Sequence, residues 1–319
     1  MAGSAPLIGV AQAPIPDGGS AEWFEGARRA KLRAALWAPA GAPRGSVVVS
    51  PGRTEPIEKY FEVVRELTAR GFVVLVHDWR GQGLSQRMLR NRLAGHAVGW
   101  RDFLADYAAL LATFETRLPQ PWIALGHSMG GCLTLLALAE GEQRFAGAIV
   151  SAPMLALLTG AVPRPLGAAL ALGLSAVGLG GLEVLGRDAP LEEPFQDNVV
   201  SHDPMRYARN QAQIAACPDL ALGGPTWGWL NFAFAAMARL AAGAGVTRIA
   251  IPLTVVAAQD DKIIDVPGQR AVAARVPGAR WVEVAGAYHE ILQETDEIRA
   301  VFWREFDALT AQVATSPPA

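Results

Sequence analysis

The sequence predicts an α/β protein: a mostly parallel central sheet flanked by helices on both faces, with a helical cap inserted between two strands. Two patterns indicate this class. Short apolar runs alternate with amphipathic helical patterns, and this alternation stops after Pro153 and resumes near Ile251. A chain of 319 residues is long enough for one such domain with an insertion.

Six apolar runs are predicted as strands of this sheet. They are Val47–Val49, Phe72–Val76, Trp122–Leu125, Ala148–Val150, Leu253–Ala257 and Trp281–Val284. Apolar residues at helical spacing from Ile57 to Leu67 predict a crossover helix, and Gly71 is expected to end it. A second stripe from Trp100 to Phe114 and a helix-forming run from Cys132 to Glu140 predict two further helices. We assign these stripes to the core.

The interruption after Pro153 is too long for a structureless loop, so we expect a helical cap over residues 154–247. Residues 166–182 of this segment carry no charge and several glycines. The run is shorter than the roughly 20 residues that a membrane-spanning helix needs. Two interpretations stay open: a cap helix packed on the main domain, and an apolar rim that contacts lipid.

The α/β core is predicted to comprise residues 21–153 and 248–313, with flexible ends at 1–20 and 314–319. The first segment lacks the basic and apolar regions of a signal peptide, and two cysteines make no disulfide framework. We therefore expect a cytoplasmic protein, with membrane association through the cap as a further option. The sequence does not indicate an oligomeric state.

Charge is nearly balanced, with 28 Lys and Arg against 30 Asp and Glu. This balance excludes the basic footprint of a nucleic-acid partner and does not require an ionic substrate. The sequence contains no clustered Cys/His ligand set and no phosphate-cradling loop. We therefore predict no metal and no organic cofactor.

Residues Gly126 to Gly130 read G-x-S-x-G between a predicted strand and a predicted helix. This context predicts a nucleophile elbow, in which glycines allow a tight reversal and Ser128 is held in a strained conformation. The hydroxyl of Ser128 then projects above the sheet as a candidate nucleophile. The alternative is a glycine turn in which Ser128 only caps the helix.

A catalytic serine needs a general base and an acid that orients it, and in this fold class they follow in the order acid, then histidine. His289 is the one histidine of five that follows the last predicted strand, so we predict it as the base. The acid is expected after the run that ends at Ala258, where Asp260 and Asp261 are both candidates.

An oxyanion hole is the third requirement, and it needs two backbone N–H groups. Met129, directly after the nucleophile, is expected to supply one. Arg53, in the glycine turn after Val47–Val49, is expected to supply the other. The Arg53 side chain has two interpretations: a solvated arginine, and a contact for a phosphate-bearing substrate.

Several motifs together resemble a known family. They are Ser50–Arg53, Asp78–Ser85 (D-x-R-G-x-G-x-S), Gly126–Gly131 and Gly286–Leu292, with His202–Tyr207 and Gly223–Trp227 in the cap. With them the chain resembles the α/β-hydrolase superfamily, and within it the lysophospholipase and monoacylglycerol lipase group, especially the bacterial lysophospholipase L2-like proteins. The sequence departs from that group at Pro51, where the animal lipases have histidine, and at Ala258, where the acid loop usually has glycine.

The resemblance implies a serine hydrolase that cleaves esters with one acyl chain, in a lysophospholipid or a monoacylglycerol, through an acyl-enzyme. It favours Asp261 over Asp260 as the acid, because such loops place the carboxylate three residues after a small strand-ending residue. It also leads us to expect substrate contacts from four residues: His127, Arg206, Trp227 and Tyr288.

Other functions stay open. A carboxylesterase or cofactor-free perhydrolase acting on non-lipid esters would share the triad, although perhydrolases usually lack a long cap. A non-enzymatic ligand-binding protein of the same fold would usually lose one triad member, and here candidates for all three are present. A dehalogenase would carry aspartate in place of Ser128.

Overall fold

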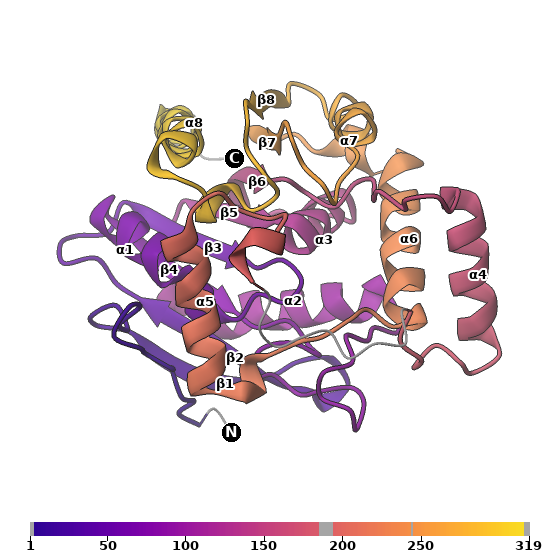
Figure 1. Cartoon of the computed structure of the whole chain (residues 1–319). Helices are drawn as coiled ribbons and strands as arrows, with labels where there is room; N and C mark the ends of the chain where they lie inside the picture. Colours follow the sequence, from indigo (N-terminus) through magenta and orange to yellow (C-terminus); the bar gives the residue numbers. More distant parts are fainter. Residues whose placement is uncertain (1–2, 185–193, 244, 316–319) are drawn as a thin grey trace.

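The computed structural model describes residues 3–184, 194–243 and 245–315. At its centre is an eight-stranded sheet with the strand order β1-β2-β4-β3-β5-β6-β7-β8 (Figure 1). The pairs β1–β2 and β2–β4 are antiparallel, and all other neighbours in the sheet are parallel. The predicted α/β class with a mostly parallel sheet is therefore confirmed.

All six predicted runs lie within strands, and the two strands nearest the N-terminus were not predicted. The strands are β1 (Ser20–Glu25), β2 (Lys31–Trp37), β3 (Gly45–Ser50), β4 (Phe72–His77), β5 (Trp122–His127), β6 (Phe145–Ser151), β7 (Leu253–Ala258) and β8 (Arg280–Val284). Charged residues interrupt β1 and β2, so neither shows the continuous apolar run of the buried parallel strands.

Helices cover both faces of the sheet. Those in the described residues are α1 (Phe61–Ala69), α2 (Trp100–Phe114), α3 (Ser128–Ala139), α4 (Arg164–Ala176), α5 (Pro204–Ala216), α6 (Trp227–Ala241), α7 (Val266–Ala273) and α8 (Asp296–Thr315). The predicted crossover helix is a short 3₁₀ turn, Ile57–Tyr60, followed by α1. Gly71 follows α1 with a φ of +85°, a conformation that glycine adopts readily.

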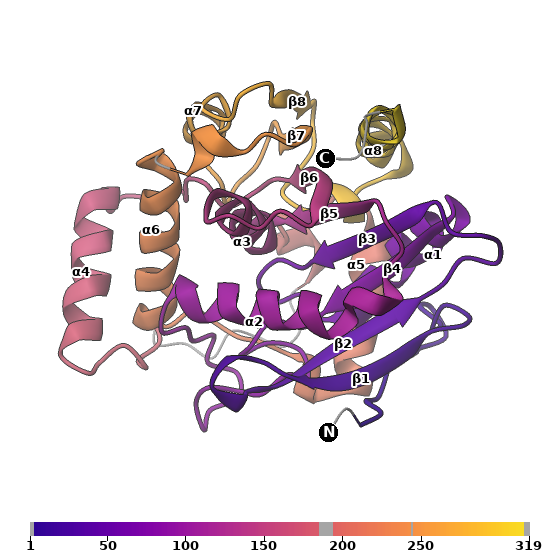
Figure 2. The same ribbon diagram turned by 180° about the vertical axis from the view of Figure 1, so that it is seen from behind.

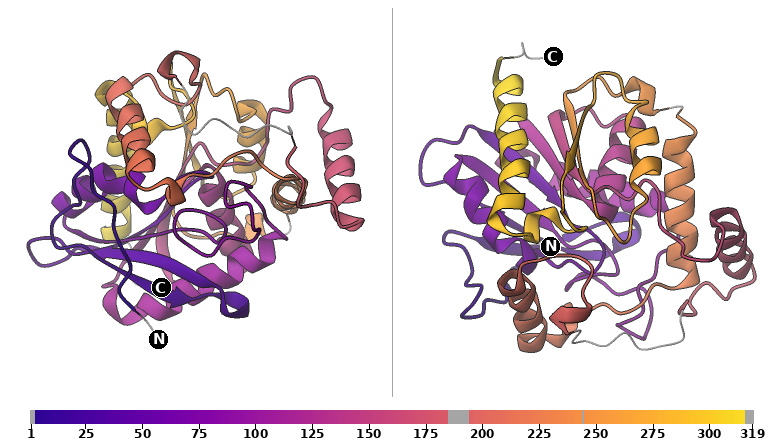
Figure 3. Two further views of the ribbon diagram at one scale, coloured as in Figure 1. Left: turned by 60° about the horizontal axis from the view of Figure 1, so that its bottom comes forward. Right: turned by 45° about the horizontal axis from the view of Figure 1, so that its top comes forward.

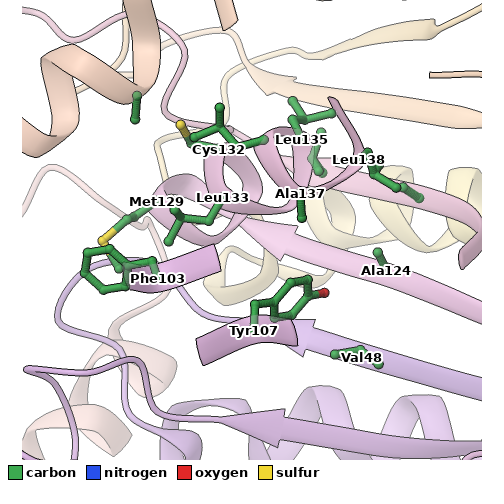
Figure 4. Packing of buried hydrophobic residues seen from close by; sticks show 14 of the residues in the cluster. Val48, Phe103, Tyr107, Ala124, Met129, Cys132, Leu133, Leu135, Ala137 and Leu138 are labelled. Carbon is green, nitrogen blue, oxygen red and sulfur yellow. The ribbon is translucent and has the colours of Figure 1, made fainter. Parts of the chain in front are cut away.

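Successive side chains of a strand point to opposite faces of the sheet, so the apolar residues form two cores, one on each face. In β3, Val47 and Val49 pack in the cluster formed with α1 and α8. Val48 packs in the other cluster, with residues of α2 and α3 such as Tyr107 and Leu133 (Figure 4). Helix α3 is buried along its whole length, so the element that begins with Ser128 is fixed from all sides.

The inserted segment contributes α4, α5 and α6 between β6 and β7, in agreement with the predicted helical insertion. Helix α6 packs against α3, and α4 packs against the far side of α6 (Figures 1 and 2). Helix α5 lies on the other side of the molecule and packs against Ile57–Tyr60 (Figure 3). Among the described residues, no helix has the length and apolar character needed to cross a bilayer.

Both ends of the described chain form contacts or regular structure. Residues 3–19 contact the core: the N–H of Ala5 donates to Ala21, and the indole N–H of Trp37 donates to the carbonyl of Pro16. A Pro- and Gly-rich segment forms no regular element, yet its carbonyl groups still accept hydrogen bonds from the sheet. At the other end, α8 continues to Thr315, and residues 316–319 of the predicted tail lie outside the described residues.

Candidate active site

The turn between β5 and α3 holds Ser128 in an unusual backbone conformation. Its φ is +49°, in the left-handed region, which costs a non-glycine residue about 1–3 kcal/mol. The flanking glycines allow close backbone packing there. A Cβ at Gly130 would lie 2.0 Å from the carbonyl oxygen of Ser50, and a Cβ at Gly126 would lie 2.7 Å from the Cα of Gly131. The G-x-S-x-G pattern is thus a steric requirement of this turn.

Three predicted residues meet at this turn. His289 Nε2 lies 2.8 Å from Ser128 Oγ, and His289 Nδ1 lies 2.7 Å from Asp261 Oδ2. All three side chains are buried, with Ser128 retaining 8% exposure. The neighbouring Asp260 is exposed, so the structure places Asp261, of the two adjacent aspartates, against the imidazole.

Asp261 is held as an anion by its surroundings. Its Oδ1 accepts the N–H groups of Ile263 and Ile264 at 2.8 and 2.9 Å. Burial alone would raise the pKa of Asp261, but the hydrogen bond and charge of His289 and the two backbone bonds outweigh burial and lower it. An ionised Asp261 accepts the Nδ1–H of His289, which leaves Nε2 free to take a proton from Ser128.

The two N–H groups predicted to form the oxyanion hole have no acceptor among the described residues. In the loop after β3, the N–H of Gly52 donates to Glu55 and the N–H of Thr54 donates to Gln82. Between them, the N–H of Arg53 has no acceptor among the described residues. The N–H of Met129 lies in the first turn of α3, where helix geometry provides no acceptor. Both predicted oxyanion donors are therefore free to bind a ligand.

His127 connects the loop after β3 to the backbone of His289. Its Nδ1 lies 3.0 Å from Glu55 Oε2, and its Nε2 lies 3.2 Å from the carbonyl oxygen of His289. Burial alone would lower the pKa of His127, but the charge and hydrogen bond of Glu55 outweigh burial and raise it. A protonated His127 can donate through both ring nitrogens. Both ring nitrogens of His127 are thus bonded to protein groups, Glu55 and the carbonyl of His289.

Glu55 is a buried residue that the sequence did not single out. It also accepts from the hydroxyl of Tyr60 at 2.6 Å and pairs with Lys59 Nζ at 3.1 Å. Burial alone would raise the pKa of Glu55, but the charges of His127 and Lys59 and the hydrogen bonds of His127 and Tyr60 hold it well below its usual range. No local pattern identifies Glu55, because its partner His127 lies 72 residues away in the sequence.

A cavity of about 280 Å³ lies between α5 and the loops that follow β3 and β8. Polar and apolar residues both line it, and the predicted residues Arg53 and Arg206 are among them. Ser128 and His289 are not among the lining residues, but the predicted oxyanion donor Arg53 is, and so is Glu290, which follows His289 in the sequence. The cavity thus borders the loop that carries Arg53 and the segment that follows His289.

Arg206 is bound by protein carboxylates. Its guanidinium contacts Glu62 at 2.8 Å, Asp203 at 2.7 Å and Asp296 at 2.5 Å. A further donor reaches the carbonyl of Glu294 at 2.8 Å. These contacts join α5 to α1 and to the start of α8, so Arg206 borders the cavity with its charge already paired.

The last two residues predicted to contact substrate lie outside the cavity lining. The ring of Tyr288 lies against His202, with 3.9 Å between ring centroids. Trp227 begins α6, and its N–H donates to Leu182 at 3.0 Å. It is Trp229, two residues further on, whose ring lies under the guanidinium of Arg53, at 5.3 Å.

The sequence matches the family described as serine aminopeptidase, S33, over residues 41–296. The chain therefore belongs to this family of serine hydrolases, and its fold is the α/β-hydrolase fold.

The relatives of this chain act on lipids, according to their names. Lysophospholipase L2 of Escherichia coli is 33% identical over 274 residues, which is 80% of this chain and 77% of that protein. The monoacylglycerol lipase of Mycolicibacterium smegmatis is 28% identical and covers 86% of this chain and 91% of its own. The structure of a soluble variant of Saccharomyces cerevisiae monoglyceride lipase superposes with a TM-score of 0.71 at 19% identity, over 91% of this chain and 95% of that one. This last similarity concerns the fold.

Proposed function

We propose that this protein is a serine ester hydrolase that cleaves lipids with a single acyl chain, lysophospholipids or monoacylglycerols, through an acyl-enzyme on Ser128. The observation that carries the proposal is the hydrogen-bonded series Ser128–His289–Asp261 at the elbow. Family membership and the names of the full-length relatives support the same reaction class.

The proposed mechanism uses only groups of this chain. His289 Nε2 takes the proton of Ser128 as its oxygen attacks the ester carbonyl carbon, while Asp261 stabilises the imidazolium. The N–H groups of Met129 and Arg53 hold the resulting oxyanion. His289 then protonates the leaving alcohol, and the same residue activates the water that releases the fatty acid.

Peptide hydrolysis, which the family description includes, is a second candidate with less support. An aminopeptidase must bind a substrate ammonium group, and a free carboxylate beside the nucleophile suits that task. The carboxylate that lines the adjacent cavity, Glu290, already pairs with Lys59 at 2.6 Å. This arrangement favours an ester substrate.

Labelling with a fluorophosphonate probe tests the nucleophile. Wild-type protein should react covalently, and Ser128→Ala should not, because the probe requires an activated serine oxygen. Ser175→Ala, on α4, is the matched control and should label like wild type. Labelling of Ser128→Ala, or none of wild type, would contradict the mechanism.

A substrate panel tests the lipid assignment. Each buried CH₂ contributes about 0.8 kcal/mol, so kcat/KM should rise severalfold per CH₂ as the acyl chain lengthens. Lysophospholipids, monoacylglycerols and nitrophenyl esters of increasing chain length should all show this rise. A flat response, or a preference for acetyl esters, would favour a carboxylesterase of non-lipid esters instead.

We also propose that α4 and its flanking residues contact a lipid surface, where such substrates reside. Large apolar side chains are exposed along this segment: Leu158, Val162, Leu166, Leu170, Leu172, Val177, Leu179 and Leu182. No charged residue interrupts 165–182. Helix α4 lies at the outer edge of the molecule, with α6 between it and the core (Figures 1 and 2). Such a patch marks an interaction surface.

A further inference from the structure

We propose that the Arg53 side chain forms a subsite for the phosphate group of the substrate, so that among single-chain esters this enzyme selects lysophospholipids over monoacylglycerols. This inference rests on the proposed ester hydrolysis at Ser128 and specifies its substrate.

The position of Arg53 is the first support. Its backbone N–H, which the mechanism uses as an oxyanion donor, has no acceptor among the described residues, and its side chain lines the cavity of about 280 Å³. In a lysophospholipid only the glycerol carbons separate the acyl ester from the phosphate. An ester carbonyl held at this loop therefore brings a phosphate to the side chain of the same loop.

The second support is that Arg53 has no counter-charge. No carboxylate in the described parts of the chain forms an ion pair with it, and its Nε is buried without a hydrogen-bond partner. One terminal nitrogen donates to the carbonyl of Gly223, and the guanidinium lies over the ring of Trp229. The guanidinium is thus held in place by neutral groups.

The other two cations of the lining differ from Arg53 in this respect. Lys59 lies 3.1 Å from Glu55 and 2.6 Å from Glu290, and Arg206 contacts three carboxylates. Glu290 is the carboxylate among the described lining residues, and it pairs with Lys59. The unneutralised charge at the cavity is therefore that of Arg53.

Burial without a counter-ion also changes the acidity of this group. Desolvation lowers the pKa of Arg53 to about 10, which still leaves the guanidinium protonated at neutral pH. A buried, unpaired charge is unfavourable, and an anion that accepts charge-assisted hydrogen bonds from the guanidinium relieves that cost. The arrangement favours a phosphate, whose oxygens match the donor fork of arginine.

Two amides on α5 add further polar groups to the cavity. Asn210 and Gln211 both line it, and their side-chain oxygens are buried without a partner among the described residues. Amide oxygens accept hydrogen bonds from hydroxyl or ammonium groups. Both occur in the headgroups that follow the phosphate of a phospholipid.

The test compares kcat/KM for a lysophospholipid and a monoacylglycerol with the same acyl chain. Arg53→Gln should lower the ratio of the two values by about 10- to 100-fold, because it removes a charge-assisted hydrogen bond to the phosphate. Using the ratio cancels any disturbance of the oxyanion hole, which affects both substrates. Arg53→Lys should retain part of the preference, and Arg101→Gln, an exposed arginine on α2, is the control.

A second variant leaves the oxyanion loop unchanged. A Cβ at Gly95 would lie 2.5 Å from a terminal nitrogen of Arg53, so Gly95→Ala should displace the guanidinium and lower the same ratio. Inorganic phosphate should inhibit wild type and not Arg53→Gln. An unchanged ratio of kcat/KM values in both variants would overturn the phosphate subsite. That conclusion would hold even if inorganic phosphate slowed the hydrolysis of both substrates equally. Failure of Ser128 to label would instead overturn the proposed hydrolase.

Discussion

At the scale of single residues, local motifs identified the residues that meet at the elbow, and long-range pairs escaped prediction. Ser128 and His289 each follow a predicted parallel strand of the same sheet, Ser128 after Trp122–Leu125 and His289 after Trp281–Val284. Their proximity at one edge of the sheet could therefore be expected. The environments of Arg53 and Arg206 depend on residues far away in sequence, such as Gly223 and Glu62. No local pattern shows that one of these arginines is paired and the other is not.

Substituting each of the two adjacent aspartates tests which one orients the base. Asp261→Asn should lower kcat by as much as about 10⁴, because His289 loses the partner that fixes its tautomer and stabilises its charged form. Asp260→Asn, at an exposed carboxylate, is the matched control and should have far less effect. Steady-state kinetics on one nitrophenyl ester decides between them, and a larger loss for Asp260→Asn would reverse the assignment.

Substituting His127 tests, through pH, whether its hydrogen bonds to Glu55 and to the carbonyl of His289 stabilise the fold. The raised pKa of His127 means that the folded state binds its proton more tightly than the unfolded state does. The stabilisation is therefore complete below the unfolded pKa of about 6.5 and is lost as pH rises through the folded value. The difference in Tm between wild type and His127→Gln should shrink from pH 6 to pH 9.

Tyr60→Phe is the matched control for that experiment. It removes one hydrogen bond to Glu55 while keeping His127, so its Tm should follow the pH dependence of wild type. A difference between wild type and His127→Gln that is independent of pH would mean that His127 contributes through packing alone.

At the scale of elements, the parallel strands were predictable and the antiparallel pair β1–β2 was not. Strands buried on both faces show continuous apolar runs, whereas β1 is an edge strand with exposed Ser20 and Glu25 at its ends. Arg33, inside β2, is fully buried because it pairs with Glu58 and Asp78, each at 2.7 Å. A buried arginine interrupts the apolar run by which a buried strand is recognised. Its partners Glu58 and Asp78 lie in other elements, so the sequence of β2 alone does not show that Arg33 is buried.

The proposed lipid contact of α4 predicts a loss of vesicle binding on adding charge. Leu170→Glu with Leu172→Glu places carboxylates on two exposed positions and should reduce co-sedimentation with phospholipid vesicles at least severalfold, because charges disfavour the interface. Hydrolysis of a soluble short-chain nitrophenyl ester should be unchanged. Substitution of Val98 by Glu, at an exposed apolar residue outside α4, is the control; equal binding by all variants would contradict the proposal.

At the scale of the whole molecule, ion pairs connect the inserted cap segment to the core. Arg206 and Arg209 of α5 both contact Glu62 of α1, and Arg299 of α8 lies within 3.5 Å of the same carboxylate. Burial alone would raise the pKa of Glu62, but the hydrogen bond of Arg206 and the charges of the three arginines lower it to about 2. The position of α5 beside the cavity therefore depends on charges as well as on apolar packing.

This connection predicts how Arg206→Gln changes stability with pH. The depressed pKa of Glu62 contributes stability that is present above its unfolded value of about 4.3 and is lost as pH falls toward 2. The variant should lose about 1.5–3 kcal/mol of unfolding free energy at pH 7, since charge-assisted hydrogen bonds disappear. Its stability should also decline less steeply than that of wild type between pH 5 and pH 2.

Arg209→Gln is the matched control, because Arg209 contacts Glu62 from a more exposed position and should have a smaller effect in denaturant titrations. The same pair of variants separates this structural role from the substrate contact that the sequence led us to expect for Arg206. A raised KM in Arg206→Gln with unchanged unfolding free energy and unchanged acid response would mean that Arg206 binds substrate. Lower stability with the shallower acid response would mean that its charge serves to hold α5 against the core.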